Sequence, residues 1–355
     1  MRTQIHTSLS PALRAEWDAL WALNPSRATA VNSSAWLVAA QEAFRHHDIR
    51  IVTVHGDNDQ LIAVASLVRN RMYGTVIFGA PAQDFADKPP VLVDWNNNQA
   101  AAALATAFKQ IGTVYLAECS KTALDALTTA DSQSQSFQDD LNAIVTFTPD
   151  NAYGSLSKNE LTKIKKRISK VTEPVTMRHS ETSHSAMLQA VYAIESESTK
   201  NARGMQVLGR PEVRTFFETL SSIKPELIHV SVLEIGTKPV AFSVDLLTQG
   251  MYHGSQKAYL SGLDAIAPGK YLVMKLFEYY HENGYPGIDL GRGYDSLKRQ
   301  FATEAQPLYT VVLGNATTRS YISFMRTLRI KVYDTVVKQK ALYRTFKAVR
   351  SILPI

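Results

Sequence analysis

The sequence predicts an α/β protein, of the α+β kind, that is built as two domains of similar design. The chain has 355 residues, which is more than one hydrophobic core usually organises. An order of two helices followed by a strand, a turn and a second strand occurs twice along it. The composition, 45% hydrophobic and 20% charged, is that of an ordinary globular protein. We therefore expect one domain at 1–150, a second at 151–318, and a basic amphipathic helical tail at 319–355.

The first half opens with a predicted helix at 10–22, because Ser10 can cap it and Pro11 suits its first position. Apolar residues then recur with helical spacing, as they do in a helix that covers a core. The other elements expected in this half are a helix at 33–46, two strands in 49–70 joined by a turn at 56–59, strands at 75–81, 89–94 and 112–119, a helix at 101–110, a loop at 128–140 and a closing strand at 141–149.

The second half repeats this order without recognisable sequence identity to the first. Three apolar strands in 227–259 are separated by turns at 236–237 and 249–250. The other elements expected here are helices at 155–171, 183–200 and 210–223, a loop at 201–209, a helix that starts at Pro268, and strands at 286–291 and 308–314.

Positive charge is concentrated in two segments. Residues 158–170 hold six Lys/Arg against one Glu, and residues 319–355 hold nine against one Asp. Because the whole chain carries only +6, the remainder is acidic, with a net charge of −7. This pattern argues against a general DNA or RNA binder and predicts two local sites that meet anions.

Several classes of protein are excluded by what the sequence lacks. A single cysteine, Cys119, allows neither a disulfide framework nor a cysteine-rich metal site. The neighbours His46 and His47, and the pair His179 and His184, have no companion ligands at metal spacing. The chain start has no apolar signal core, and no run of about 18 apolar residues follows. We expect a cytoplasmic protein without a metal.

The stretch PGKYLVMKLFEYYHE, which begins at Pro268, is the first candidate site. Proline lacks an N–H that a helix start would leave unpaired, and Gly269 lets a ligand approach the backbone. Free N–H groups and the helix dipole suit a phosphate. A capped core helix explains the same residues, because proline is common at helix starts.

Three segments in order resemble one family: IESESTKNARG at 194–204, the run from Gly250 to Gly293, and YDSLKRQF at 294–301. They resemble GNAT-like acyltransferases of the CelD type, associated with cellulose biosynthesis and related to the FemAB aminoacyltransferases; residues 17–44 also look like that family's opening. The resemblance implies two tandem GNAT-like domains, each a mixed, mostly antiparallel sheet flanked by helices. It also implies an acyl-CoA or acetyl-CoA donor and no metal. The implied activity is N- or O-acyl transfer to a sugar, a polysaccharide precursor or a related small molecule.

The resemblance places the CoA pyrophosphate at Pro268, Gly269, Lys270 and Tyr271. Acyl transfer also needs a base for the acceptor and an acid for the leaving thiolate. The candidate bases are Glu195, Glu197, His253 and Asp289, the candidate acid is Tyr294, and the expected lining residues are Lys200, Arg203, Ser255, Arg292 and Lys298.

Each candidate also has a structural explanation. Glu195 suits a solvated carboxylate paired with Lys200, and His253 suits a hydrogen-bonded core residue. Asp289 lies in an apolar strand, where it needs a partner such as Arg292 or Lys298. Thr199, Asn201 and Arg203 depart from the family pattern, which leaves the acceptor side open. Thr199, in place of a usual Trp, also allows a non-catalytic scaffold in exopolysaccharide assembly.

The two basic segments leave alternatives as well. The helix at 158–170 is either a solvated face or a surface for an anionic sugar or lipid phosphate. FemAB-like transfer from aminoacyl-tRNA ranks lower, because we find no helical-hairpin insertion of the kind those proteins carry. In the tail, an apolar stripe, including Tyr321, Phe324, Leu328 and Val332, repeats among basic residues. We expect this stripe to dock on the second domain; peripheral contact with an anionic membrane is the rival.

Overall fold

The computed structural model describes residues 1–180, 184–202 and 204–338, with side chains as far as residue 332. In this part of the chain thirteen strands belong to one sheet, ordered β1-β2-β3-β4-β6-β13-β7-β12-β11-β10-β9-β8, with β5 paired to β3 beside this path. The strands are β1 Arg2–His6, β2 Ile49–His55, β3 Leu61–Met72, β4 Thr75–Gly79, β5 Val91–Leu92, β6 Val114–Cys119, β7 Gln135–Thr146, β8 Val175–His179, β9 Ile228–Ile235, β10 Lys238–Thr248, β11 Met251–Tyr259, β12 Gly287–Arg292 and β13 Glu304–Leu313.

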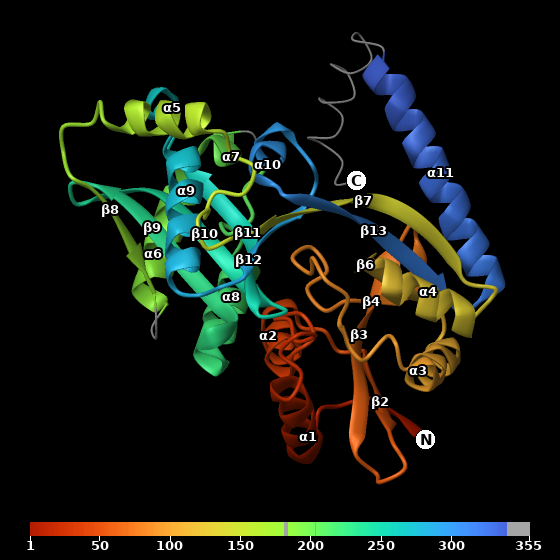
Figure 1. Cartoon of the computed structure of the whole chain (residues 1–355). Coiled ribbons are helices and arrows are strands. Elements are labelled where there is room, and N and C mark those ends of the chain that lie inside the picture. The colour runs from red at the N-terminus through yellow and green to blue at the C-terminus, as the bar shows by residue number, and fades with distance from the viewer. Residues whose placement is uncertain (181–183, 203, 339–355) are drawn as a thin grey trace.

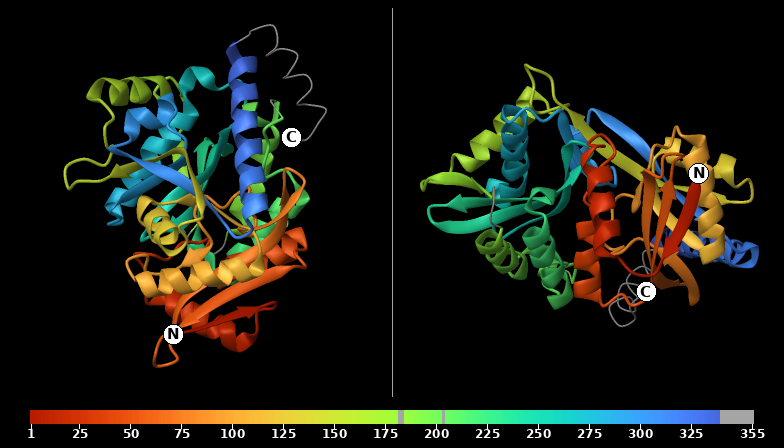
Figure 2. Two further views of the ribbon diagram at one scale, coloured as in Figure 1. Left: turned by 90° about the vertical axis from the view of Figure 1, so that its right-hand side faces the viewer. Right: turned by 90° about the horizontal axis from the view of Figure 1, so that it is seen from below.

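Helices cover both faces of this sheet. In the second half α9 lies on one face and α6 and α8 lie on the other, as the view from below shows (Figure 2). The helices are α1 Pro11–Ala22, α2 Ser34–Phe44, α3 Asn98–Ile111, α4 Lys121–Ala130, α5 Lys158–Ile168, α6 Ser185–Ser196, α7 Thr199–Ala202, α8 Pro211–Ile223, α9 Pro268–Glu282, α10 Ser296–Phe301 and α11 Ala316–Lys338.

Each half runs through the same order of elements, apart from α5, which precedes β8, and the short β5 and α7. A strand is followed by two helices, three antiparallel strands, a helix, a strand parallel to the previous one, a short helix and a last strand. The last strands are exchanged: β13 lies between β6 and β7, while β7 lies between β13 and β12. These two long strands cross the middle of the molecule and make one sheet of both halves (Figure 1).

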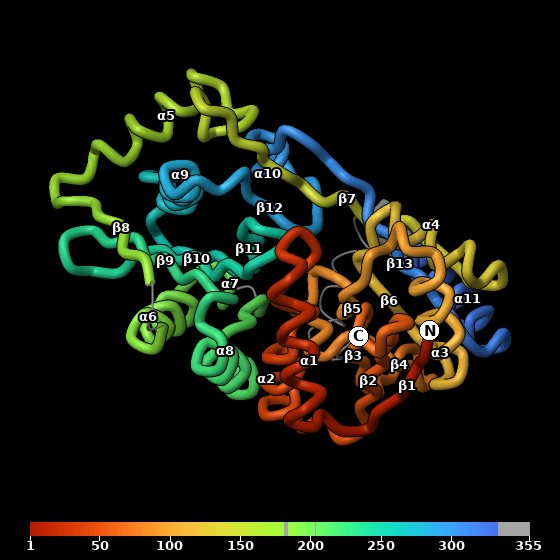
Figure 3. Tube along the Cα trace, turned by 60° about the horizontal axis from the view of Figure 1, so that its bottom comes forward, coloured from red at the N-terminus to blue at the C-terminus, as the bar shows by residue number. Residues whose placement is uncertain are grey.

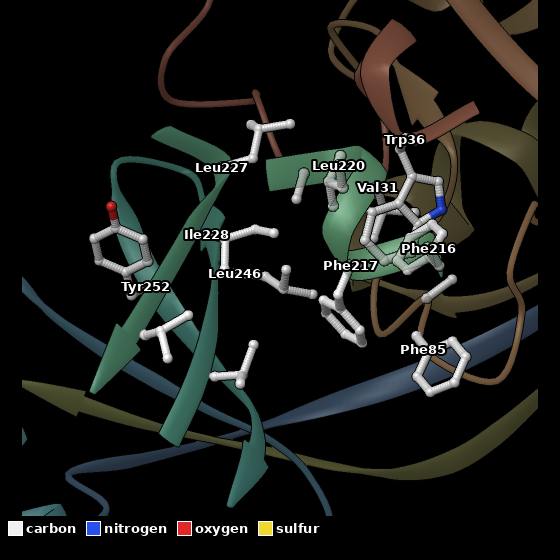
Figure 4. Close-up of a cluster of buried hydrophobic side chains, with 14 of the residues drawn as sticks. Val31, Trp36, Phe85, Phe216, Phe217, Leu220, Leu227, Ile228, Leu246 and Tyr252 are labelled. Atoms are coloured by element: carbon white, nitrogen blue, oxygen red, sulfur yellow. The ribbon is translucent and has the colours of Figure 1, made fainter. Parts of the chain in front are cut away.

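The main hydrophobic core also spans both halves. Trp36 of α2 packs edge-on against Phe216 of α8, with ring centroids 4.7 Å apart. Phe85, from the segment after β4, packs edge-on against Phe217. Figure 4 shows these rings together, and Figure 3 shows α1 and α2 between the strands of the first half and α8 of the second. Each of these four side chains is nearly or fully buried.

The structure confirms the expected α/β architecture and most of the expected elements. In α1, Ser10 caps the helix by accepting a hydrogen bond from the Leu13 N–H, as predicted. The loop expected at 128–140 is wrong, because α4 ends at Ala130 and β7 begins at Gln135. β7 pairs with a strand on each side, so backbone hydrogen bonds hold it despite its polar sequence. The sequence analysis also missed β1, α4, β8 and α10.

The expectation for the C-terminal stripe is wrong within the described residues. α11 is attached through Ile322, which is fully buried against Ile77 and Val312 in the middle of the sheet. Tyr321, Phe324, Leu328 and Val332 remain exposed and cover no part of the second half. No helix in the described ranges is long and apolar enough to cross a membrane.

Candidate functional site

An opening between two parallel strands forms the centre of the candidate site. β11 and β12 are neighbours only at Tyr252 with Ile288 and at His253 with Asp289, and beyond these pairs the two strands separate. The opening begins next to a β-bulge, because Val244 of β10 faces Gln256 while Asp245 faces Gly254. Ser255 is therefore left out of the ladder with β10, and its Oγ is buried without a partner among the described residues. Bulges of this kind often re-aim strands beside active sites.

The start of α9 lies after the third strand, at the far end of this opening. Pro268 is its first residue and is buried, and no described side chain caps the helix. Ala267, the residue before it, adopts a left-handed conformation with φ of 52°. Lys270 Nζ donates to Gln300 Oε1 of α10 at 3.1 Å. This helix start therefore offers N–H groups and a nearby ammonium, as the sequence analysis predicted for residues 268–271.

Gly269 has a different reason for lacking a side chain from the one expected. A Cβ at this position would lie 3.0 Å from the Tyr259 ring, so the glycine makes room for that ring. The expectation that the glycine gives a ligand close access to the backbone therefore finds no support in the packing. Tyr271 is half-buried on the same helix.

A buried set of charges joins the two halves beside the opening. His253 Nε2 lies 2.7 Å from Asp87 Oδ2 of the first half, and its Nδ1 lies 3.2 Å from Asp289 Oδ1. Lys88 Nζ donates to Asp289 Oδ2 at 2.6 Å, and Asn142 Nδ2 of β7 donates to the same oxygen at 3.0 Å. The Gly291 N–H donates to Asp289 Oδ1 at 2.7 Å. The side chains of His253 and Asp289 are each 3% exposed.

These contacts set the protonation states of the cluster. Burial lowers the pKa of His253, but the carboxylates of Asp289 and Asp87 overcome it and raise that pKa to about 9. Burial favours the neutral form of Asp289, but Lys88 and His253 hold its pKa well below the usual range. Burial and His253 act in opposite directions on Asp87, and the net effect is a lowered pKa. At neutral pH the cluster holds two cations and two carboxylates.

The expected partners of Asp289 were wrong. Arg292 instead donates to Glu118 Oε1 of β6 at 2.8 Å, and Lys298 Nζ donates to the Gly291 carbonyl at 3.0 Å. Lys88 takes the place beside Asp289 because the segment between β4 and β5 reaches across to the second half.

Three lysines gather on the other side of the opening. Lys257 of β11 reaches back across Gly254 to Asp245, with Nζ 3.4 Å from Asp245 Oδ1, and a Cβ at Gly254 would collide with that ammonium. Burial lowers the pKa of both Lys200 and Lys298, and the Lys257 ammonium lowers each further. The three charges are thus close enough to act on one another, which makes this side of the opening attractive to an anion.

Glu195 is buried at the end of α6, with 1% of its surface exposed. Its Oε1 accepts a hydrogen bond from the Val207 N–H at 3.1 Å, and its Oε2 has no partner among the described residues. Its charge also acts on Lys200, which connects it to the lysines of the opening.

The remaining candidates lie at the rim or outside the described structure. Glu197 is exposed at the end of α6. Tyr294 is half-buried and stacks against the Arg299 guanidinium, whose Cζ lies 5.3 Å from the ring centroid. Arg203 is outside the described residues. The structure thus brings His253 and Asp289 together, with Ser255 two residues further along β11, while Glu195 lies at the end of α6.

A cavity of about 760 Å³ lies between the halves. The first half contributes Arg71 and Phe85, and the second contributes Val207, Arg210 and Arg292. Since the Glu195 carboxylate holds Val207, it lies directly behind the wall of this cavity. Cavities of this size hold small-molecule ligands in many proteins.

Several residues of the site were missed in the sequence. Asp87, Lys88, Glu118 and Asn142 all come from the first half, and Lys257 lies in β11 of the second half. An Asp-Lys pair directly before Pro89 and Pro90 was the one visible signal. It indicates a turn, but not which half the turn contacts.

Comparison with known protein families gives a match to part of the chain. Residues 158–299 match the acetyltransferase (GNAT) domain. The matched segment contains α6, β11, α9, β12 and the whole opening between the two strands. The GNAT match supports a transferase and agrees with the predicted fold class. A search of the curated proteins gave no match.

Solved structures resemble the whole chain in fold. FemX superimposes with a TM-score of 0.65 at 12% identity, covering 91% of this chain and all of that one. The C-terminal domain of a putative lysylphosphatidylglycerol synthetase from Agrobacterium fabrum gives 0.57 at 14% identity, covering 89% and 95%. L-PGS from Bacillus licheniformis gives 0.51 at 14% identity, covering 92% and 98%. The GNAT segment and its partner half therefore share an overall fold with these proteins.

Proposed function

We propose that the protein is an acyltransferase that uses an acyl-CoA or acetyl-CoA donor. The acceptor is an amine or hydroxyl of a sugar, a polysaccharide precursor or a related small molecule, as in the CelD-type family that the sequence resembles. One observation carries the proposal: the opening between β11 and β12 has a bulge at Ser255 and leads to the uncapped start of α9, within the GNAT segment.

The negative charge of the donor's pyrophosphate suits the positive end of α9 at its start. The N–H groups of Gly269 and Lys270, together with the Lys270 ammonium, would hold the pyrophosphate, and Pro268 and Tyr271 would frame it. The donor supplies a thioester carbonyl that is already activated for transfer. Lys257 and Lys298 supply positive charge for the oxygen of that carbonyl as it becomes negative.

The acceptor site is the cavity between the halves. Arg71, Arg210 and Arg292 line it and favour an acceptor that carries a phosphate or carboxylate beside its reactive group. Asp84 and Glu118 partly neutralise two of these arginines through ion pairs with Arg210 and Arg292.

Glu195 is the best base for the acceptor's proton. His253 is protonated at neutral pH because its pKa is about 9, and the Asp289 carboxylate already receives hydrogen bonds from three donors. Glu195 keeps one oxygen without a partner among the described residues. In the transfer, the acceptor atom bonds to the acyl carbon and the carbon–sulfur bond breaks. Glu195 takes the acceptor's proton, and the thiolate leaves, with Tyr294 as the candidate proton donor.

Thermal unfolding of the full chain with CoA and with acetyl-CoA tests the donor. Binding to the native state must raise the melting temperature. We expect Lys270→Ala to weaken the donor about fivefold, whereas Lys275→Ala, which removes the same charge further along α9, changes affinity little. Glu195→Gln should keep donor binding and lose about a hundredfold in turnover. If no CoA thioester shifts the melting temperature at millimolar concentration, the donor assignment is wrong.

Transfer from aminoacyl-tRNA is the second candidate, favoured by α5. Its last turn carries Lys165, Lys166 and Arg167, and Lys165 acts electrostatically on Glu278 of α9, so a basic surface lies against the donor helix. Tight, salt-sensitive binding of tRNA, with no response to CoA, would favour this candidate. A folded protein that binds neither donor would instead support the non-catalytic scaffold.

A further inference from the structure

The C-terminal helix α11 contacts the body mainly through one face, although on the other face the Tyr321 hydroxyl at the start of the helix donates to the Tyr73 carbonyl at 3.1 Å. On the inner face, Ile322 is buried against the sheet, and Arg326 forms an ion pair with Asp139 of β7. Arg319 approaches Asp131 at 3.7 Å. The body therefore neutralises the inner arginines and holds the first half of the helix along the outside of the molecule, far from α5 and α9 (Figure 1).

The outer face carries an exposed apolar stripe. Tyr321 is 41% exposed, Phe324 63%, Leu328 43% and Val332 47%. Their spacing of three, four and four residues places them in one row along the helix. Each residue turns a helix by about 100°, so this row lies about 150° away from the inner face. Exposed Lys331 lies about 65° from the row on one side, and exposed Arg329 lies about 95° from it on the other.

The charge of the segment decides which partner suits this face. Residues 319–355 hold nine Lys/Arg and one Asp, and Asp131 and Asp139 of the body pair with Arg319 and Arg326. Two copies meeting through this stripe would bring like charges together. An anionic lipid surface takes the apolar side chains between its headgroups and attracts the lysines and arginines beside them.

We propose that α11 docks the protein on an anionic lipid surface through Tyr321, Phe324, Leu328 and Val332. Arg329 and Lys331 contact the headgroups on either side of this stripe. Because the inner face is held by Ile322 and Arg326, the whole body is oriented with respect to the membrane.

Co-sedimentation of the full chain with vesicles tests this docking. We expect binding to vesicles of equal parts phosphatidylcholine and phosphatidylglycerol, little binding to phosphatidylcholine alone, and release as salt is raised. Leu328→Asp places a charge in the stripe and should weaken binding about tenfold or more. Ile330→Asp makes the same change of charge at a residue that is 49% exposed on the opposite side of the helix, and should keep most of the binding.

Melting temperatures separate docking from misfolding, because both variants alter exposed side chains and should melt like the wild type. Equal losses in the two variants would show that bulk charge alone is responsible and would overturn the role of the stripe. A full chain that ignores anionic vesicles would also overturn it. In that case, a dimer that Leu328→Asp dissociates would show that a second copy of the chain covers the stripe. A lowered melting temperature for Leu328→Asp would instead show that residues 339–355 of the same chain cover it.

Discussion

In the first half, the helix that follows the third antiparallel strand is capped at its start by a side chain. Asn97 caps α3 by accepting a hydrogen bond from the Ala100 N–H at 3.1 Å. In the second half the corresponding helix, α9, begins after the left-handed Ala267 with no side-chain cap. The start of α3 thus satisfies one of its N–H groups with a side chain, while the start of α9 has no side-chain acceptor among the described residues. Under the function proposed above, the same order of elements gives a supporting half, which is the first, and a reactive half, which is the second.

The helices that follow the first strand of each half, α1 after β1 and α6 after β8, also differ. α1 and α6 each have twelve residues, and in each the penultimate side chain is buried and holds the loop that follows. In α1 this residue is Trp21, whose Nε1 donates to the Thr29 carbonyl. In α6 it is Glu195, which receives the Val207 N–H. An indole and a carboxylate do the same structural work, but only the carboxylate can accept a proton.

The first half nevertheless completes the second. The segment between β4 and β5 brings Asp87 and Lys88 to His253 and Asp289, and β7 brings Asn142 to the same carboxylate. The supporting half thus supplies charge to the reactive half, and this contact can be broken by mutation.

The largest effect is expected from Lys88→Met, which keeps the aliphatic stem and removes the charge. Asp289 is then buried without its main cation, and breaking a buried pair on one side costs about 3–5 kcal/mol. Urea denaturation measures this loss in the free energy of unfolding. Lys121→Met is the matched control, because Lys121 pairs with Asp125 on the exposed surface and its loss should change the free energy of unfolding little. Similar losses in both variants would show that the two halves are not held together by this cluster.

The second-largest expected effect is a change of folding stability with pH, caused by His253. The pKa of His253 is about 9 in the folded protein and near its ordinary value of 6.5 when unfolded, so the folded state binds the proton more tightly. Its stabilisation is complete below the unfolded pKa and is lost as pH rises through the folded pKa. Urea denaturation between about pH 6.5 and 9.5 should show a fall of up to about 3 kcal/mol in the wild type. This fall should be much smaller in His253→Gln. Parallel pH profiles would contradict the protonated state that we assign to this histidine.

The sequence predicted those parts of the fold whose signals are local. Ser10 and Pro11 mark a helix start, and the turn at 236–237 separates two apolar strands, so each could be read from a few neighbouring residues. β7 could not be read in this way, because its polar residues are held in the sheet by strands from both halves. The exchange of β7 and β13 is a long-range pairing that leaves no local pattern.

The candidate site was predictable on one side only. His253, Asp289 and the start of α9 lie within a single stretch of the second half. Both the residue types and the family resemblance predicted a site in that stretch. Their partners Asp87 and Lys88 come from far away in the sequence, and the partners expected for Asp289 were nearby residues instead. A buried carboxylate predicts that some cation is near, but not which cation. Only the three-dimensional structure identifies Lys88 as the cation that pairs with Asp289.

The smallest effect tests whether the first half really is closed to a donor. Asn97→Ala removes the cap of α3 and should lower the free energy of unfolding by about 1 kcal/mol, while Asn97→Ser keeps a capping oxygen and should restore most of it. Because the donor is assigned to α9, neither change should alter the shift in melting temperature that acetyl-CoA produces. Comparing those shifts with that of Lys270→Ala, which lies at the other helix start, makes the measurement decisive. If Asn97→Ala alters the acetyl-CoA response and Lys270→Ala does not, the donor binds in the first half and the roles of the two halves are reversed.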